Sequence, residues 1–372
     1  MSSISYSLLA ILLTVSSVSW AQKVTVGTAK TKDGGEYKGE IKSGKPHGKG
    51  VARYDNGNHY EGQFEKGKRS GFGTYTFSDG EKYEGYWYED QQHGKGTFYF
   101  KNNNRYEGMW YRDYQQGEGV MYYYNGDKYE GGWKLDKRSG KGTYTFASGA
   151  YYKGEWSEDM KNGKGVFDWG DGSYYDGQWL NNQRSGRGTY RYSDGDEYKG
   201  EWKNDIQHGK GIYTFKNGDV YEGDYVEGER TGTGIVSYAN GDKYTGQFNS
   251  GDKEGQGTLV WKNGDTYTGE WKGDLRHGTG KLRLNNGDLY EGKWENGKLN
   301  GECIIHYADG SKFKGDFADD KRDGKAIEED SKGNRFEGSY KNDKRDGPFV
   351  EKDHTGKITA SGTYQSGWRN ED

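Results

Sequence analysis

The residues best suited to acid–base or metal chemistry do not form a recurrent set in this sequence. Four histidines each stand directly before a glycine: His47, His93, His208 and His277. Histidine is a common general base and metal ligand. The local context of these four recurs elsewhere in the chain without the histidine, which favours solvent-facing turn residues. No catalytic or metal-binding set follows from them.

Three other candidates lead to the same conclusion. Cys303 is the only cysteine, and no flanking motif offers it a base, which favours a packed thiol over a nucleophile. The segment 168–172 (DWGDG) has aspartates in a loop, but it lacks the spacing and the final Glu of a calcium loop. Glycine pairs such as Gly209 and Gly211 do not precede a helix, as a phosphate-binding loop requires. We therefore expect no enzyme, cofactor or metal.

The composition predicts a thin aromatic core. The 372 residues include 65 Gly, 34 Tyr, 13 Phe and 12 Trp, while the whole hydrophobic class is only 29%. So many aromatic residues exclude ordinary disorder. The 54 Lys and Arg against 58 Asp and Glu give a net charge of -4, without the basic excess that nucleic acid selects. Nucleic acid is therefore not an expected partner.

The segment 1–21 resembles a secretory signal peptide. An apolar run of eight, LLAILLTV at 8–15, precedes small polar residues and a small-x-small pattern that ends at Ala21. The run is far shorter than the roughly 20 residues that a bilayer requires. We expect cleavage near Ala21 and a secreted or periplasmic protein. A single cysteine excludes an internal disulfide, so other interactions must stabilise it there.

The rest of the chain is an internal repeat. From Tyr37 onward, an aromatic residue followed two positions later by Gly returns at a constant period of 23, fourteen times without a slip. With that aromatic as position 0, Gly occupies positions 2 and 11 in all fourteen repeats, and position 4 is aromatic in thirteen. Position 13 is Gly in the first eleven, and position 20 is Gly in all but one. Position 0 is occupied by Tyr37, Tyr60, Tyr83, Tyr106, Tyr129, Tyr152, Tyr175, Tyr198, Tyr221, Tyr244, Tyr267, Tyr290, Phe313 and Phe336.

Each repeat has two stretches of period-two patterning separated by turn signals, which predicts a β-hairpin. Positions 0, 2 and 4 share one face of the first strand, and positions 13, 15 and 17 share one face of the second. Glycines at positions 2 and 13 leave room for rings to lie over bare backbone. Asn-Gly or Asp-Gly at positions 19 and 20 favour positive φ in the connecting turn. The predicted fold is all-β: an elongated, open antiparallel meander of tandem hairpins in a single sheet.

The segment 198–220 (YKGEWKNDIQHGKGIYTFKNGDV) carries the full pattern, which resembles the MORN repeat (membrane occupation and recognition nexus). The resemblance covers the chain from 37 to about 358. It implies a twisted, solenoid-like array of hairpins that serves as a scaffold or binding surface. It further implies membrane-apposed assemblies and, in some members, contact with phospholipid. The catalytic domain that flanks enzyme-linked arrays does not occur in this sequence.

The pattern divides the chain into five parts. A signal peptide at 1–21 and an N-terminal flanking segment at 22–36 precede twelve regular repeats at 37–312. Acidic residues at positions 15 and 17, such as Glu328 and Glu351, interrupt the predicted aromatic row in the last two repeats. We therefore expect two degenerate capping repeats at 313–358 and a C-terminal tail or flanking strand at 359–372, because a repeat array needs modified ends.

Basic residues gather at positions 8, 9 and 12 and predict a ridge along one edge of the sheet. Such a ridge attracts anionic lipid headgroups, although neighbouring acids interrupt it, and a locally neutralised solvated edge is the alternative. The predicted lipid-binding residues are Lys68, Arg69, Lys137, Arg138, Lys141, Arg184 and Arg187.

The third and fourth repeats carry extra tyrosines at positions that are polar elsewhere. Tyrosine is enriched where binding needs a large contact area with a polar tip. Positions 3 and 16 point away from the consensus aromatic face, so Tyr86, Tyr99 and Tyr122 form a patch on the opposite surface or close a curl in the sheet. The predicted binding residues are Tyr86, Tyr88, Tyr99, Tyr111, Tyr114, Tyr122 and Tyr124.

Three functions fit these features. The first is a non-catalytic scaffold of the cell envelope or extracellular space, which presents a long β-surface lined by aromatic residues and glycine to a protein partner. Binding of anionic phospholipid rests on the basic ridge and on the family resemblance. Binding of cell wall or another glycan rests on surface aromatics. The sequence does not indicate the oligomeric state.

Overall fold

The computed structural model describes residues 23–371; the predicted signal peptide lies outside them. These residues contain strands and turns and no helix, so none is long and apolar enough to cross a membrane as a helix. The chain divides into two compact units, and we call residues 23–139 the N-terminal unit and residues 140–371 the C-terminal unit. Strand β11 (Lys137–Thr145) begins in the first and ends in the second.

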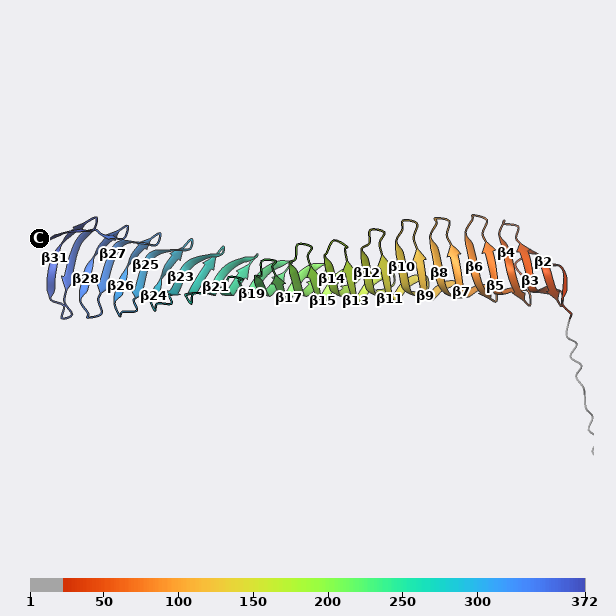
Figure 1. Ribbon diagram of the computed structural model, residues 1–372, viewed down its shortest axis with the longest axis horizontal. Helices are drawn as coiled ribbons and strands as arrows, with labels where there is room; N and C mark the ends of the chain where they lie inside the picture. Colours follow the sequence, from red (N-terminus) through yellow and green to blue (C-terminus); the bar gives the residue numbers. More distant parts are fainter. Residues whose placement is uncertain (1–22, 372) are drawn as a thin grey trace, which may run out of the picture. The chain divides into compact units, whose positions relative to one another are not determined.

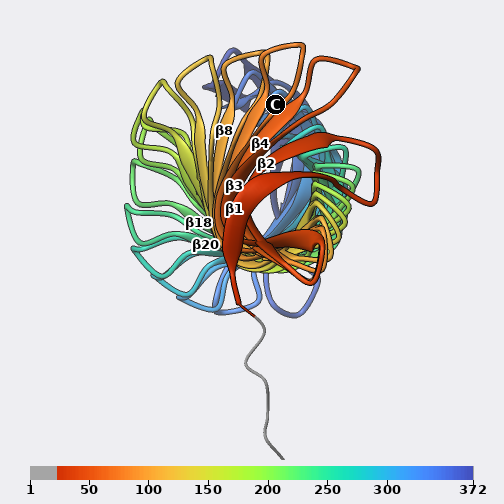
Figure 2. The ribbon, with the colours of Figure 1, turned by 90° about the vertical axis from the view of Figure 1, so that its right-hand side faces the viewer.

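The N-terminal unit is a meander in which each strand pairs antiparallel with the next along the chain (Figure 1). Seen along the stack, its orange to yellow hairpins fan out in succession, which is the twist of the sheet (Figure 2). Its strands are β1 (Thr25–Lys30), β2 (Glu36–Lys42), β3 (Lys45–Arg53), β4 (His59–Glu65), β5 (Lys68–Thr76), β6 (Lys82–Tyr88), β7 (Gln91–Tyr99), β8 (Arg105–Tyr111), β9 (Tyr114–Tyr122) and β10 (Lys128–Lys134).

The C-terminal unit repeats this antiparallel arrangement, and the all-β hairpin meander predicted from the sequence is confirmed. Its further strands are β12 (Tyr151–Ser157), β13 (Met160–Asp168), β14 (Tyr174–Leu180), β15 (Gln183–Arg191), β16 (Glu197–Lys203), β17 (Ile206–Thr214), β18 (Val220–Val226), β19 (Glu229–Ser237), β20 (Lys243–Asn249), β21 (Asp252–Val260), β22 (Thr266–Lys272), β23 (Leu275–Arg283), β24 (Leu289–Glu295), β25 (Lys298–His306), β26 (Lys312–Ala318), β27 (Lys321–Glu329), β28 (Arg335–Lys341), β29 (Lys344–Arg345), β30 (Gly347–Lys352), β31 (Ile358–Gln365) and β32 (Trp368–Glu371).

The core of the first eleven repeats is a tyrosine ring that lies over two glycines. Tyr198 is 0% exposed, and a Cβ on Gly211 would stand only 2.5 Å from its Cε2 atom. The Tyr198 hydroxyl donates to the Glu201 carbonyl at 2.9 Å, so the buried phenol is satisfied. The glycines at positions 2 and 13 thus form the seat of the ring, as the sequence predicts. We call this side of the sheet the ring face and the opposite side the open face.

Tryptophan at position 4 joins one repeat to the repeat before it. The Trp202 Nε1 donates to the carbonyl of Gly188, which is position 13 of the preceding repeat, at 3.2 Å. Its ring meets Tyr198 edge to face at a centroid distance of 5.1 Å, and it meets Tyr175 of the preceding repeat at 5.4 Å. Edge-to-face pairs of this kind add roughly 0.5–1.5 kcal/mol beyond area burial. Ring contact and hydrogen bond therefore both run between neighbouring hairpins.

The glycine at position 11 serves a β-bulge rather than a ring. It has positive φ in every repeat, from 55° at Gly278 to 126° at Gly324. Between β16 and β17 the register shifts beyond Gly200, so that Gly209 and the residue after it have no opposite partner. A bulge that needs left-handed backbone favours glycine, which explains this glycine at each equivalent position.

Two different turns connect the strands. At positions 6 and 7 both residues have positive φ, as in Asn204 (51°) and Asp205 (68°), which is a type I′ turn. At positions 17–20 only the last residue has positive φ, except in the turn at 169–172, where Gly170 also has a φ of 79°. Gly218, for example, has a φ of 91° and donates its N–H to the Phe215 carbonyl at 2.9 Å. The Asn-Gly pairs at positions 19 and 20 therefore place only the glycine in left-handed backbone. Asn103, with φ of 65°, replaces glycine in one repeat.

The last repeats hold carboxylates on the ring face by ion pairing. The Arg345 Nη2 lies 3.0 Å from the Glu328 Oε2, and the Tyr340 hydroxyl donates to the same carboxylate. An Arg369 guanidinium nitrogen lies 3.4 Å from the Glu351 Oε2. The acids that interrupt the aromatic pattern are therefore neutralised. Strands β31 and β32 extend the sheet through most of the segment predicted as a tail or flanking strand.

Gly211→Ala tests the seat of the ring. Because the added methyl would overlap the Tyr198 ring, we expect a loss of about 1–3 kcal/mol in the free energy of unfolding. The exposed turn substitution Lys216→Ala should change it by less than about 0.5 kcal/mol. Urea unfolding followed by circular dichroism measures both, and equal effects of the two substitutions would contradict the seat.

The buried phenols also predict alkaline unfolding. Burial is the main cause that raises the pKa of Tyr221 to about 12, and it raises the pKa of Tyr198 and Tyr244 as well. Since an unfolded Tyr titrates near about pH 10, these groups contribute full stability below that pH. The contribution is lost as pH rises through the folded pKa, by about 1.4 kcal/mol per pH unit for each Tyr that unfolds. The tyrosinate absorbance of the buried tyrosines should appear together with the loss of circular dichroism. Ionisation of all 34 tyrosines with the circular dichroism unchanged would contradict this.

Candidate binding surfaces

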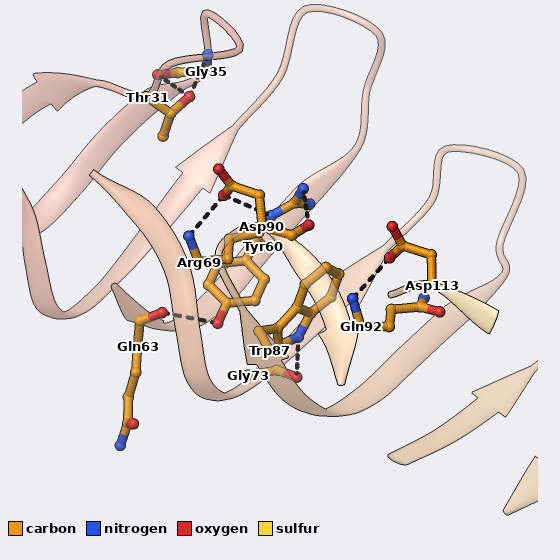
Figure 3. Close-up of polar contacts among 10 residues, drawn as sticks. All are labelled: Thr31, Gly35, Tyr60, Gln63, Arg69, Gly73, Trp87, Asp90, Gln92 and Asp113. Carbon is orange, nitrogen blue, oxygen red and sulfur yellow. Dashed lines mark hydrogen bonds and ion pairs between the residues drawn. The ribbon is translucent and has the colours of Figure 1, made fainter. Parts of the chain in front are cut away.

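A cation at position 9 covers the aromatic rings of the ring face on their solvent side. The Arg69 Cζ lies 4.5 Å from the Trp87 ring centroid and 5.0 Å from that of Tyr75. Its Nη2 donates to the Asp90 carbonyl at 3.0 Å, and the Asp90 carboxylate accepts the Arg69 backbone N–H at 2.7 Å (Figure 3). Asp90 stands at position 7 of the next repeat. The cation, the ring and the carboxylate together form what we call the interrepeat clamp.

The interrepeat clamp recurs along both units. Arg184 and Asp205 repeat it, with the guanidinium 4.4 Å from the Trp202 ring. Lys161 lies 4.1 Å from the Trp179 ring, and burial is the main cause that lowers its pKa. Where position 9 is Gln92, its backbone N–H still donates to Asp113 at 2.7 Å (Figure 3). The position 9 side chains thus belong to the packing of the array.

This arrangement divides the residues predicted to bind lipid. Arg69 and Arg184 lie over rings on the ring face, and the Arg138 guanidinium lies 5.7 Å from the Tyr129 ring. The other four do not lie over these rings. Lys68 is the first residue of β5 and pairs with Glu89 at 3.4 Å, and Lys137 is the first residue of β11. Lys141 and Arg187 are at position 12, on the open face. The structure places the side chains of positions 8 and 9 on opposite faces, so they form no single ridge in either unit.

The predicted binding tyrosines lie in the N-terminal unit, and six of the seven are on the open face in three rows. Tyr86 is 51% exposed and meets Phe72 of the neighbouring strand at 5.6 Å. Tyr88 and Tyr111 are 58% and 50% exposed, and His93 lies between their rings at 5.6 and 5.3 Å. Tyr114 lies opposite Tyr111 in the same row, whereas Tyr124 is in the turn after β9.

The third row alternates cations with rings at the other end of the same strands. Lys82 lies 4.3 Å from the Tyr99 ring, and Arg105 lies 4.4 Å from the Tyr122 ring. These cations also pair with glutamates on their own strands, as Arg105 does with Glu107 at 2.8 Å. A cation therefore already covers one face of each of these two rings. The freely exposed apolar surface is formed by Phe72, Tyr86, Tyr88, Met109, Tyr111 and Tyr114, which we call the tyrosine surface.

A groove of about 940 Å³ crosses the open face of the C-terminal unit. Glycine backbone forms its floor, and Ile212 and Ile235 contribute side chains from one row. The other row is polar, and there Lys210 pairs with Asp224 at 2.5 Å. The floor N–H and C=O groups belong to the strand ladder, so a bound molecule would contact chiefly these side chains.

The residues singled out for chemistry are structural. Cys303 is 1% exposed, and burial is the main cause that raises the pKa of its thiol to about 12, far from a nucleophile. Asp168 and Asp171 accept hydrogen bonds within their own turn, from Gly170 and Ser173. His208 stands opposite Glu201 beside the bulge. Residues 23–371 contain no group of three or more His, Cys, Asp or Glu placed to hold a metal ion.

The repeat seen in the sequence and in the hairpins matches the family model described as MORN repeat fourteen times. The matches run in steps from 37–59 to 313–335, with a shorter one at 336–348. The chain belongs to the MORN-repeat family. The fourteen predicted MORN repeats are thereby confirmed. MORN arrays are in general binding or scaffold modules, and this coarse function is the one that the family supports.

Similar solved structures lie far from this chain in sequence. The SAS-4 (dCPAP) TCP domain of Drosophila melanogaster, in complex with a proline-rich motif of Ana2 (dSTIL), is 18% identical, with a TM-score of 0.29, over 42% of this chain and 85% of that one. The wild-type TCP10 domain of Danio rerio CPAP is 12% identical, with a TM-score of 0.17, over 78% of this chain and 98% of that one. These scores support no inference about ligands. Among curated proteins, none matches the chain.

The sequence reasoning missed the interrepeat clamp. It assigned position 9 to a surface ridge and named Asp90, at position 7, only among the acids that interrupt this ridge. The available signal was the frequent pairing of Arg or Lys at position 9 with Asp or Asn at position 7 of the next MORN repeat, as in Lys161 with Asn182. Both residues flank a turn, and their contact joins two neighbouring repeats, so alternation within one hairpin did not indicate it.

Substitutions at Asp205 test the clamp. Asp205→Gly keeps the left-handed turn but removes the hydrogen bond to Arg184, so we expect a loss of about 1 kcal/mol in unfolding free energy. Asp205→Ala adds backbone strain and should cost about 2 kcal/mol. Urea unfolding measures both substitutions.

The reciprocal control is Gly228→Asp, at position 7 of the next MORN repeat, where the carboxylate gains the Gln207 N–H. It should be neutral or stabilising, despite some strain in replacing a glycine with φ of 85°. An unchanged unfolding free energy in Asp205→Gly would contradict the clamp.

Proposed function

We propose that this MORN array is a non-catalytic scaffold that binds a protein partner through the tyrosine surface of its N-terminal unit. The supporting observation is exposure: Tyr86, Tyr88 and Tyr111 are each at least half exposed, at 51%, 58% and 50%. Phe72 and Met109 add 46% and 38% exposed side chains beside them. Exposed aromatic and Met side chains gathered on one face are typical of protein contact surfaces.

The packing of the array does not require these side chains. The repeated Tyr and Trp are buried on the ring face, where glycine seats and cations enclose them. They are therefore unavailable to a partner, and the aromatic surface expected along the whole array is reduced to the tyrosine surface. If Tyr86, Tyr88 and Tyr111 only closed a curl of the sheet, they would be buried against other residues.

Lipid and glycan remain alternative ligands. The clamp withdraws Arg69, Arg138 and Arg184 toward aromatic rings, which weakens the case for an anionic headgroup. Exposed tyrosine rings also stack on sugars, so a glycan would use the same surface. We further propose export of the protein to the periplasm or cell exterior, on the basis of the segment 1–21.

A triple substitution tests the tyrosine surface. We expect Tyr86→Ser, Tyr88→Ser and Tyr111→Ser together to weaken binding of the captured partner at least about ten-fold, because aromatic anchors dominate protein interfaces. The partner is captured from an envelope extract, and its dissociation constant is then measured with purified components.

The matched control is Leu180→Ser with Val226→Ser, which removes similarly exposed side chains at position 5 of two C-terminal repeats, 52% and 50%. Both variants should keep the parent circular dichroism. Unchanged partner affinity in the triple variant would refute the proposal. The proposal would also be refuted if no protein is captured from the extract and peptidoglycan or anionic liposomes retain the parent protein but not the triple variant.

A further inference from the structure

Strands β1 and β32 correspond to two halves of one repeat strand. In a regular repeat the second strand covers positions 8–16, as β17 does. Strand β32 pairs Trp368 with Gln365 as Ile206 pairs with Lys203, so it covers positions 8–11. Strand β1 pairs Gly27 with Gly39 as Gly211 pairs with Gly223 and covers positions 11–16. The division falls at the bulge.

Strand β32 leaves part of one edge of β31 without a neighbouring strand. Strand β31 pairs with β30 from Ile358 to Tyr364, but with β32 only from Gly362 to Gln365. Among residues 23–371, the other edge of Ile358–Ser361 has no strand beside it. In a regular repeat this stretch pairs with positions 14–16 of the second strand, as Tyr198 pairs with Tyr213. An open edge of this kind is a template for another strand.

We propose that β1 of a second copy of this chain pairs antiparallel with the open edge of β31, joining copies head to tail. The register follows the repeat: Thr28 of the second copy lies opposite Ser361 and Ala29 opposite Ala360, while Gly27 lies opposite Gly362 in place of Glu371, which pairs with Gly362 in the single copy. Strand β32 of one copy and β1 of the next then form the two halves of one strand. The interaction is separate from partner binding by the tyrosine surface.

The side chains at this junction are compatible with close pairing. Position 0, which holds a ring in all fourteen MORN repeats, is Ala360 here, and it faces Ala29 rather than a second ring. Small residues on both strands allow the backbones to approach without a clash. Unusually exposed apolar side chains flank the junction: Val26 at 80%, Ile358 at 60% and Trp368 at 81%.

The contacts across a regular junction extend the match. Within the array the N–H at position 7 donates to the carbonyl at position 9 of the preceding repeat, as Gly67 does to Pro46 at 2.8 Å. In the proposed assembly the N–H of Gly44 of the second copy would be the donor, and the carbonyl of Arg369 of the first copy would be the acceptor. Because the two edges differ, this contact is heterologous, and repeated association extends a fibre unless the copies close into a ring.

Site-specific disulfides test the register. In a Cys303→Ala background, chosen because Ala326 already occupies the same repeat position, Thr28→Cys protein is mixed with Ser361→Cys protein and oxidised. The mixture should give a cross-linked dimer, while each protein alone should give none. The double variant should give a ladder of oligomers. Lys30→Cys protein mixed with Ser361→Cys protein, which places the two cysteines two positions out of register, should cross-link at least about five-fold less, because diagonal neighbours lie farther apart.

The unsubstituted protein supplies an independent measurement. Sedimentation velocity should show a weight-average mass that rises with protein concentration. A monomer at all concentrations, or equal cross-linking in the two registers, would overturn the proposal. Cross-linking of Thr28→Cys protein with itself would indicate a head-to-head contact and would also overturn it. Loss of partner binding by the tyrosine surface variant would leave these results unchanged.

Discussion

The structure depends on the fit of a tyrosine ring over two glycines. The Tyr198 ring leaves no space for a methyl group on Gly211. The Tyr198 hydroxyl donates a hydrogen bond to a backbone carbonyl of its own strand. One side chain thus supplies the apolar burial of a hairpin and satisfies its own polar group. This explains how a chain with few aliphatic residues holds an ordered sheet in one layer.

Stability and exposure are separated between the two faces of the sheet. The ring face is closed by rings, glycines and the cations of the interrepeat clamp. The open face carries no consensus ring, so its side chains vary without loss of packing. That freedom permits the tyrosine surface in one unit and a glycine-floored groove in the other. Binding properties therefore reside where the repeat pattern is least constrained.

Much of this fold was predictable because its constraints are local. The alternation around Tyr198 gave the faces of both strands, and Gly211 gave the seat of the ring. The bulge at Gly209 was not predicted, because an invariant glycine in a strand indicates either close approach or positive φ, and spacing alone does not separate them. The role of Asp205 was missed because its partner, Arg184, lies in the previous repeat. The exposed position of Tyr86 followed from the period of two, whereas its binding partner does not follow from any local rule.

The contacts between repeats have a direction along the chain. Where a repeat has a tryptophan at position 4 or a carboxylate at position 7, that group binds the repeat before it, as Trp202 does to Gly188 and Asp205 to Arg184. A nascent chain leaves the ribosome with its N-terminal part first. Each newly synthesised hairpin therefore finds its docking groups already in place, and vectorial folding needs no segment that has yet to be translated.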